Sequence, residues 1–335
     1  MKNYLFHVGI DISKLKLDVV LVDKKETDLK KHFVVTNNTK GLKRMVSFLK
    51  KQGIDFKQTL FCFENTGMYT FPLSCFCYDN NYDYWVVPAL EIKRSLGILR
   101  VKSDKNDAKD IASYSIRFRD KLKLSSIPEK EIQKLKLLYS EREKLKKSIL
   151  IFKSTKENED FTPTDIYKTV KTQNNRTVKF LEASLKAIES KMRDIIKRAP
   201  KLKRQFELIK SIKGVGEKTA IYFIIATKGF NAFSSARKLA CYAGVAPFEY
   251  SSGSSIRGRT KVNHMADKTM KALLQMCAMS AVRHDAQLKD YYLRKQDEGK
   301  NNMLVLNNVR CKIIGRIFAV IKRDSPFIDT YKFAA

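Results

Sequence analysis

The chain has 335 residues, enough for two or three domains with separate cores. Lysine and arginine number 66 against 35 aspartates and glutamates, a formal net charge of +31, spread along the whole chain, which favours nucleic acid over a membrane surface as partner. No stretch approaches the roughly 20 apolar residues that span a bilayer. No signal peptide precedes the first acidic residue, and the 6 cysteines lack zinc-site spacing. We expect a cytoplasmic, DNA-associated protein with reduced thiols.

Residues 1–125 alternate strand and helix patterns, which predicts a mixed α/β domain. Short apolar runs predict strands, the first two of which form a hairpin, at 7–14, 15–22, 32–36, 59–64 and 84–88. Apolar residues at helical spacing predict helices at 41–51 and 68–78.

Two of these strands carry an acidic residue at their end. Asp11 follows the apolar run of the first strand, and Glu64 ends the strand at 59–64 in the same way. A carboxylate among apolar neighbours is costly unless it is paired, hydrogen-bonded or bound to a metal, so Asp11 is a candidate site residue. The alternative is a turn aspartate that caps the bend together with Ser13.

A second acidic pair begins a predicted helix at 104–116. Asp104 and Asp107 are three residues apart and therefore project from one helical face, although acids in a first turn also complement the helix dipole. Together with Asp11 and Glu64 they supply the oxygen ligands that two divalent cations about 4 Å apart require. Asp110, one turn further along the same face, is the alternative ligand.

Residues 126–200 predict two coiled-coil-like helices. Apolar residues recur at three-and-four spacing from 135 to 152, with Arg142 at the skipped position, and from 178 to 195 without a break. A polar connector containing Pro163 is expected at 153–176. The pattern fits an intramolecular hairpin and an intermolecular seam equally well, and its even heptads favour a dimer.

Residues 201–335 predict a mainly α-helical domain, with helices at 236–242, 265–282, 285–296 and 303–322. Its first part, 208–220, has the form of a helix-hairpin-helix, in which Gly214 and Gly216 let backbone N–H groups reach a phosphate and Lys218 adds a cation. A plain turn between packed helices is the alternative reading.

The segment 250–261 is predicted to be a loop that combines hydroxyls, glycines and cations. Such a composition suits a phosphodiester backbone, although a flexible linker has a similar composition. The candidate nucleic-acid-binding residues of this segment are Ser251, Gly253, Arg257, Arg259 and Lys261.

Four separated motifs resemble the DEDD transposases of bacterial insertion sequences, the family that includes the Piv DNA invertase. The motifs lie at 9–14 (Gly-Ile-Asp-Ile-Ser-Lys), 64–69 (Glu-Asn-Thr-Gly-Met-Tyr), 102–108, and 244–253, in the family's order over nearly the whole chain. Three departures are modest: Ser103 stands where threonine is commoner, Val87 where asparagine is usual, and 261–266 departs from the commoner Lys-Arg-Gly form.

The resemblance implies a RuvC-like, RNase H-type domain at 1–125, a coiled coil at 126–200 and a transposase domain at 201–335. It implies that the four acids bind divalent metal, Mg²⁺ or Mn²⁺, and that Ser252 attacks DNA, with Ser251 as the local rival. It also implies a structured non-coding guide RNA that pairs with donor and target DNA. A homo-oligomer is expected, a dimer or a tetramer on DNA.

The predicted function is therefore an insertion-sequence transposase or site-specific DNA recombinase. The main alternative is a RuvC-like junction nuclease that uses water and forms no protein–DNA adduct. A sugar-kinase or actin-like ATPase would need further glycine-rich phosphate loops. A non-catalytic basic nucleic-acid binder explains the charge but leaves four placed acids without a role.

Overall fold

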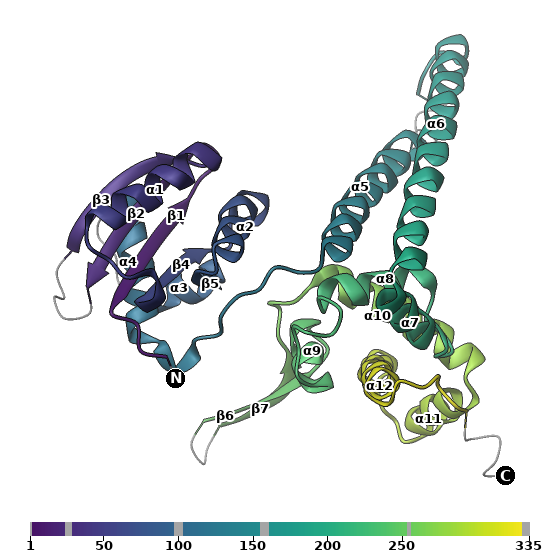
Figure 1. Ribbon diagram of the computed structural model, residues 1–335. Coiled ribbons are helices and arrows are strands. Elements are labelled where there is room, and N and C mark those ends of the chain that lie inside the picture. Colours follow the sequence, from purple (N-terminus) through teal and green to yellow (C-terminus); the bar gives the residue numbers. More distant parts are fainter. Residues whose placement is uncertain (1, 24–28, 97–102, 155–160, 253–255, 330–335) are drawn as a thin grey trace. The chain divides into compact units, whose positions relative to one another are not determined.

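The computed structural model describes residues 2–23, 29–96, 103–154, 161–252 and 256–329 (Figure 1). For the strand residues 29–30, 250–252, 256–257 and 259–261, the structure describes the backbone and not the side chains. The chain divides into two compact units, Met1–Ile127 and Pro128–Ala335. The finer division at residue 200 remains a prediction.

The first unit is built on a five-stranded mixed sheet with the order β3-β2-β1-β4-β5. Its strands are β1 (Phe6–Ile12), β2 (Lys16–Asp23), β3 (Leu29–Thr36), β4 (Thr59–Glu64) and β5 (Asp83–Val87). The first three strands are antiparallel neighbours, whereas β4 runs parallel to β1 and β5 parallel to β4. All five predicted strands, including the hairpin, are confirmed.

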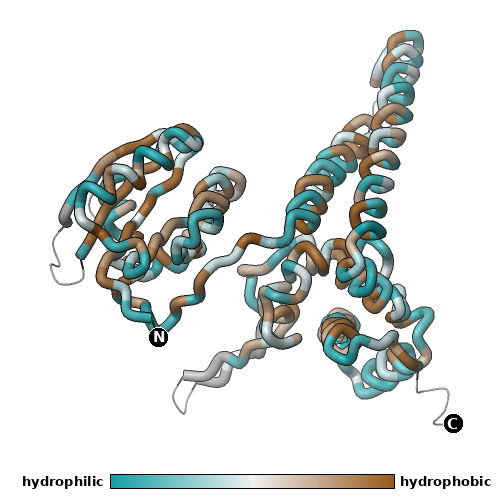
Figure 2. Tube along the Cα trace, viewed as in Figure 1, coloured by the Kyte–Doolittle hydropathy of each residue, from teal (hydrophilic) through white to brown (hydrophobic). Residues whose placement is uncertain are grey.

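Helices cover both faces of this sheet. α1 (Thr39–Lys51) and α2 (Phe71–Asp79) pack on one face, where Val8, Ile10 and Phe61 are fully buried. α3 (Ala89–Ser95) and α4 (Asp104–Arg117) pack on the other face. The strands are rich in hydrophobic residues (Figure 2), and these residues are buried on both faces of the sheet. Burial on both faces explains why the strands lack strict alternation. α3 is an addition to the predicted elements.

The second unit is helical and surrounds one large apolar core. Its helices are α5 (Lys130–Lys153), α6 (Thr164–Arg198), α7 (Pro200–Lys210), α8 (Glu217–Ala226), α9 (Ala236–Tyr242), α10 (Lys268–His284), α11 (Ala286–Asp297) and α12 (Asn302–Arg323). The last four match the predicted helices within a few residues. Short 3₁₀ turns elsewhere in the chain lie at Phe56–Gln58, Gly67–Thr70 and Arg119–Lys121.

Helices α5 and α6 pack against each other within the chain. Arg142, at the position where the apolar spacing skips, is 3% exposed, and its Nε donates to Glu189 Oε1 of α6 at 2.8 Å. A buried cation is tolerated when a carboxylate compensates it, and such a pair also fixes the register of two helices. The predicted coiled coil and the predicted dimer seam stay predictions.

The connector predicted at 153–176 is wrong from residue 164 onward, because α6 already begins at Thr164. Its first turns carry few apolar residues, Ile166, Tyr167 and Val170, and residues 171–177 are all polar, so the apolar pattern of a helix is interrupted there. Pro163 directly precedes the helix, a position where its missing N–H group does not disturb the helical hydrogen bonds.

The loop predicted at 250–261 is also wrong, because strands flank its centre. β6 (Pro247–Ser252) and β7 (Ile256–Val262) form an antiparallel two-stranded sheet. Serines, glycines and cations dominate this segment, so it lacks the alternating apolar pattern by which strands are recognised. The register pairs Ser252 with Ile256, and residues 253–255 lie outside the described part of the chain.

Among the described residues, no helix is both long and apolar enough to cross a bilayer. The 6 cysteines are free thiols.

The two glycines of the α7–α8 turn should differ in how well they tolerate substitution by alanine. Gly214 has φ +87°, and an added Cβ would lie 2.8 Å from the backbone nitrogen of Ala281, whereas a Cβ on Gly216 would meet nothing within 4 Å. We expect Gly214→Ala to lower the free energy of unfolding of the second unit by about 2 kcal/mol or more. Gly216→Ala should lower it by no more than about 1 kcal/mol, the cost of an alanine at the N-cap of α8. Urea unfolding followed by far-UV circular dichroism measures both. Equal midpoints for the two variants would contradict the turn geometry.

Candidate active site

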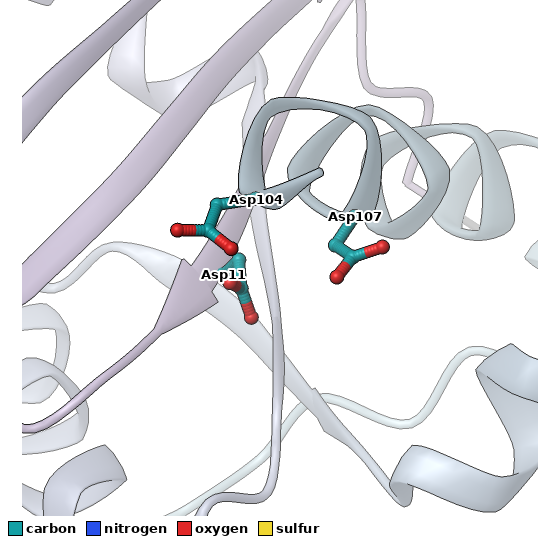
Figure 3. A group of neighbouring side chains, drawn as sticks. All are labelled: Asp11, Asp104 and Asp107. Atoms are coloured by element: carbon teal, nitrogen blue, oxygen red, sulfur yellow. The ribbon is translucent and has the colours of Figure 1, made fainter. Parts of the chain in front are cut away.

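Three of the four predicted acids come together in the first unit. Asp11 on β1 and Asp104 and Asp107 on α4 each place one carboxylate oxygen within 4.8 Å of the others (Figure 3). Asp11 and Asp107 are half-buried and Asp104 is exposed. A strand end and a helix start, about 90 residues apart in the sequence, thus converge on one small volume.

The close approach of α4 to β1 is possible because residue 9 is a glycine. A Cβ at Gly9 would collide with the carbonyl oxygen of Ala108 and lie 2.5 Å from the backbone nitrogen of Ala112. Gly9 and Asp11 are two apart in β1 and therefore face the same side of the sheet, the side that α4 covers. Because Ala108 directly follows Asp107, this contact brings the first turn of α4 over Asp11.

The start of α4 is fixed by a cap and carries the two acids where they suit the helix. Ser103 accepts a hydrogen bond from the backbone N–H of Asn106 through its side chain, and Asp104 and Asp107 lie in the first turn. Carboxylates there interact favourably with the positive end of the helix dipole. The predicted helix start, and the predicted common direction of the two acids, are confirmed.

The cluster makes Asp11 difficult to ionise. Burial raises the pKa of Asp11 to about 6, and the negative charges of Asp107, Asp104 and Glu64 act in the same direction. Neighbouring negative charges disfavour the charged form of a carboxyl group. Hard divalent cations prefer oxygen ligands of this kind, so the residues present fit such an ion.

Glu64 lies next to this cluster but is not one of its three members. Ile10 of β1 pairs with Phe63 of β4, so Asp11 and Glu64 follow one residue later at the carboxyl ends of two parallel strands. Glu64 is half-buried, and its charge contributes to the raised pKa of Asp11. Asp110, whose pKa is raised by burial and by Asp107, is also outside the group.

Sequence reasoning missed three residues beside the acids. Lys16 places its Nζ 2.6 Å from Asp104 Oδ2 and 3.1 Å from Asp18 Oδ2. Asp18 is 4% exposed and also contacts the Nε2 atom of His32 at 3.0 Å. An aspartate inside the apolar run of β2 was the available signal, since the same argument singled out Asp11.

The second unit carries the other predicted site residues. Gly216 caps the start of α8, and Lys218 forms an ion pair with Glu189 at 2.9 Å within the protein. Ser251 pairs with Arg257 across the β6–β7 ladder, and Arg259 and Lys261 follow on β7. Ser252 ends β6, and Gly253 is outside the described residues.

An acid cluster in an α/β unit, joined to a basic helical unit, is the arrangement of an enzyme that processes DNA strands. Residues 8–155 match a family model described as Transposase, and residues 206–293 match that of the transposase IS116/IS110/IS902 family. The chain belongs to this family of DEDD transposases, and it is an enzyme that cuts and rejoins DNA.

Relatives extend the similarity over nearly the whole chain. The pilin gene-inverting protein of Moraxella bovis is 27% identical over 326 residues, which cover 96% of this chain and 97% of the relative. The protein of the same name from Moraxella lacunata is 26% identical over 326 residues, with the same shares covered. The uncharacterized 43.6 kDa protein of insertion element IS110 from Streptomyces coelicolor is 29% identical over 123 residues, 37% of this chain and 30% of that protein.

The contact at Gly9 generates a prediction. We expect Gly9→Ala to push α4 away from β1, to lower the free energy of unfolding of the first unit by about 3 kcal/mol and to weaken Mn²⁺ binding. The chain has 1 tryptophan, Trp85 on β5, so its fluorescence during urea unfolding reports on this unit. Gly216→Ala is the control. A Trp85 transition unchanged by Gly9→Ala would refute the close approach.

The raised pKa of Asp11 predicts a pH dependence of stability in the metal-free protein. Because the folded pKa of about 6 exceeds the ordinary 3.8, the native state binds this proton more tightly, and the free energy of unfolding falls as pH rises from about 4 to about 6. Asp11→Asn removes that contribution and should be more stable than wild type at pH 7 in EDTA. Trp85 fluorescence measures both curves, with the exposed Asp79→Asn as control. Parallel curves for wild type and Asp11→Asn would contradict the assignment.

Proposed function

We propose that this transposase exchanges DNA strands through a covalent serine intermediate at a divalent metal site. The observation that carries the proposal is the convergence of Asp11, Asp104 and Asp107 within 4.8 Å. The mixed sheet with helices on both faces supports a RuvC-like, RNase H-type assignment for 1–125, with a coiled coil at 126–200 and a transposase domain at 201–335.

The acids would hold Mg²⁺ or Mn²⁺, with Glu64 as the fourth acid of the set. When bound, such an ion neutralises phosphate charge and stabilises a developing alkoxide. The residues' own contribution is to present several carboxylates at one edge of a sheet, on a strand and a helix that are rigidly packed together.

Ser252 supplies the nucleophile in this proposal. Its Oγ forms a bond to phosphorus while the bond between phosphorus and the 3′ oxygen breaks, and the serine proton ends on the leaving 3′ hydroxyl. The phosphoserine ester conserves the energy of the broken bond. A different 3′ hydroxyl can then attack it, restore the serine and join a new pair of strands.

The partners follow from charge and from the family resemblance. A net charge of +31 supports binding to donor and target DNA and to a structured non-coding guide RNA that pairs with both. Gly214, Gly216 and Lys218 of the α7–α8 turn, and Ser251, Gly253, Arg257, Arg259 and Lys261 of the β6–β7 segment, are the proposed contacts. A homo-oligomer, a dimer or a tetramer on DNA, is the proposed assembly.

Replacing the serine tests this chemistry directly. We expect Ser252→Ala to abolish the protein-linked DNA band and strand exchange, while DNA affinity stays within about twofold because the hydroxyl carries no charge. The measurement is a denaturing gel of labelled junction DNA with the protein, its co-expressed RNA and Mg²⁺. Ser251→Ala is the matched control and should retain the adduct.

Three outcomes separate the alternatives. Free cleaved ends in equal amounts with wild type and Ser252→Ala would make the protein a nuclease that uses water. An adduct lost only in Ser251→Ala would move the nucleophile by one residue. Unchanged cleavage by Asp11→Asn or Asp104→Asn with Mg²⁺ would count against the acidic site itself.

A further inference from the structure

A lysine ammonium group lies at the edge of the acid cluster. The Nζ atom of Lys16 is 2.6 Å from Oδ2 of Asp104, inside the cluster, and 3.1 Å from Oδ2 of Asp18, outside it. One positive charge thus bridges two carboxylates, and these hydrogen bonds raise the pKa of Lys16 to about 12, Asp104 contributing most. The amine is a permanent cation at any pH at which the enzyme works.

The two ends of this bridge differ in how firmly they are held. The Asp18 side chain is 6% exposed, and its Oδ1 contacts the Nε2 atom of His32 at 3.0 Å. Asp18 also stands directly opposite Asp11 in the β1–β2 register. The Asp104 side chain is 55% exposed, so solvent and a metal ion can reach its contact with Lys16. The Asp18 contact is therefore the anchor and the Asp104 contact is the exchangeable one.

We propose that Lys16 is an internal counter-cation that neutralises Asp104 in the metal-free enzyme and leaves it when a divalent cation binds, while staying on Asp18. This inference rests on the proposed metal site. An ammonium group and a divalent cation on the same carboxylate repel each other, and the divalent charge gains more from several carboxylates than a single positive charge does. Lys16 is thus a positioning residue that competes with metal for Asp104.

The competition makes a directional prediction that a purely structural role does not. If Lys16 only held Asp104 in place, removing its charge would weaken metal binding. If it competes, removal takes one competing cation away from Asp104 and adds net negative charge to the site, and metal binds more tightly. The sign of the change in affinity therefore decides between the two roles.

The experiment is isothermal titration calorimetry of Mn²⁺ into the full chain without nucleic acid. We expect Lys16→Met to bind Mn²⁺ about two- to fivefold more tightly than wild type. In the wild type the metal must first displace Lys16 from Asp104, and an exposed ion pair is worth about that factor in affinity. Lys16→Arg keeps the charge and should match wild type. Lys14→Met is the matched control, since Lys14 is exposed in the same turn and makes no salt bridge among the described residues.

A second readout covers the metal-free state. In EDTA we expect Lys16→Met to have a lower melting temperature than wild type, because the acids then have one counter-charge fewer. Saturating Mn²⁺ should raise the melting temperature of Lys16→Met by more than it raises that of wild type. Lys16→Gln repeats the measurement should Lys16→Met not fold.

The outcomes for the lysine and for the metal site are distinguishable. Equal or weaker Mn²⁺ binding by both Lys16→Met and Lys16→Gln, with clear binding by wild type, overturns the role of Lys16 and leaves the metal site intact. A wild type that binds no Mn²⁺, or that binds it no better than Asp104→Asn, overturns the proposed metal site itself.

Discussion

The acid cluster depends on one contact between backbones, the crossing of α4 over β1 at Gly9. A side chain at this position would collide with Ala108 and Ala112, so the helix would have to move outward and take Asp104 and Asp107 with it. His7, two residues before Gly9 on the same face, contacts Ser115, about two helical turns beyond Ala108 in α4, at 2.8 Å. The strand and helix are thus aligned along their length, and Asp11 meets the first turn of the helix because both elements are fixed elsewhere.

This alignment costs stability where it creates the site. Burial and four neighbouring acids raise the pKa of Asp11, so the folded chain would be more stable with fewer charges there. Sites that are prepared for a ligand commonly carry such strain, which the ligand relieves on binding. The ion pairs of Lys16 with Asp104 and Asp18 relieve part of the repulsion from within the chain.

Much of the first unit could be predicted from the sequence, because its strands and helices are marked by their own apolar residues and caps. The strands of the first unit are apolar on both faces, and α4 begins where Ser103 and two acids mark a helix start. The two wrong predictions, the connector at 153–176 and the loop at 250–261, concern elements that have few apolar residues to mark them. The apolar pattern of α6 is interrupted by the polar residues 171–177, and β6 and β7 are recognised only once they pair with each other.

The acidic residues of the candidate site could also be predicted from the sequence, but not all of their contacts. Acids at strand ends and in a first helical turn signal chemistry by their type and position, so Asp11, Asp104 and Asp107 could be named. Asp18, an acid inside the apolar run of β2, carries the same sequence signal as Asp11. Lys16 could not be named, because its contacts follow from the β1–β2 register and from where α4 crosses it. Lys218 carries a charge suited to nucleic acid, yet the structure gives it a carboxylate partner on α6, which composition does not reveal.

The segment that carries Ser252 is held at both ends by the helices of the second unit. Before β6, Asn307 of α12 donates to the carbonyl of Val245 at 2.8 Å, and after β7, Asp267 accepts a hydrogen bond from Tyr222 of α8 at 2.7 Å. The hairpin extends from these two fixed points (Figure 1). The acids belong to a different compact unit with its own core. The proposed reaction uses the acids and Ser252 on one and the same phosphate, so its geometry depends on how bound DNA presents that phosphate to both groups.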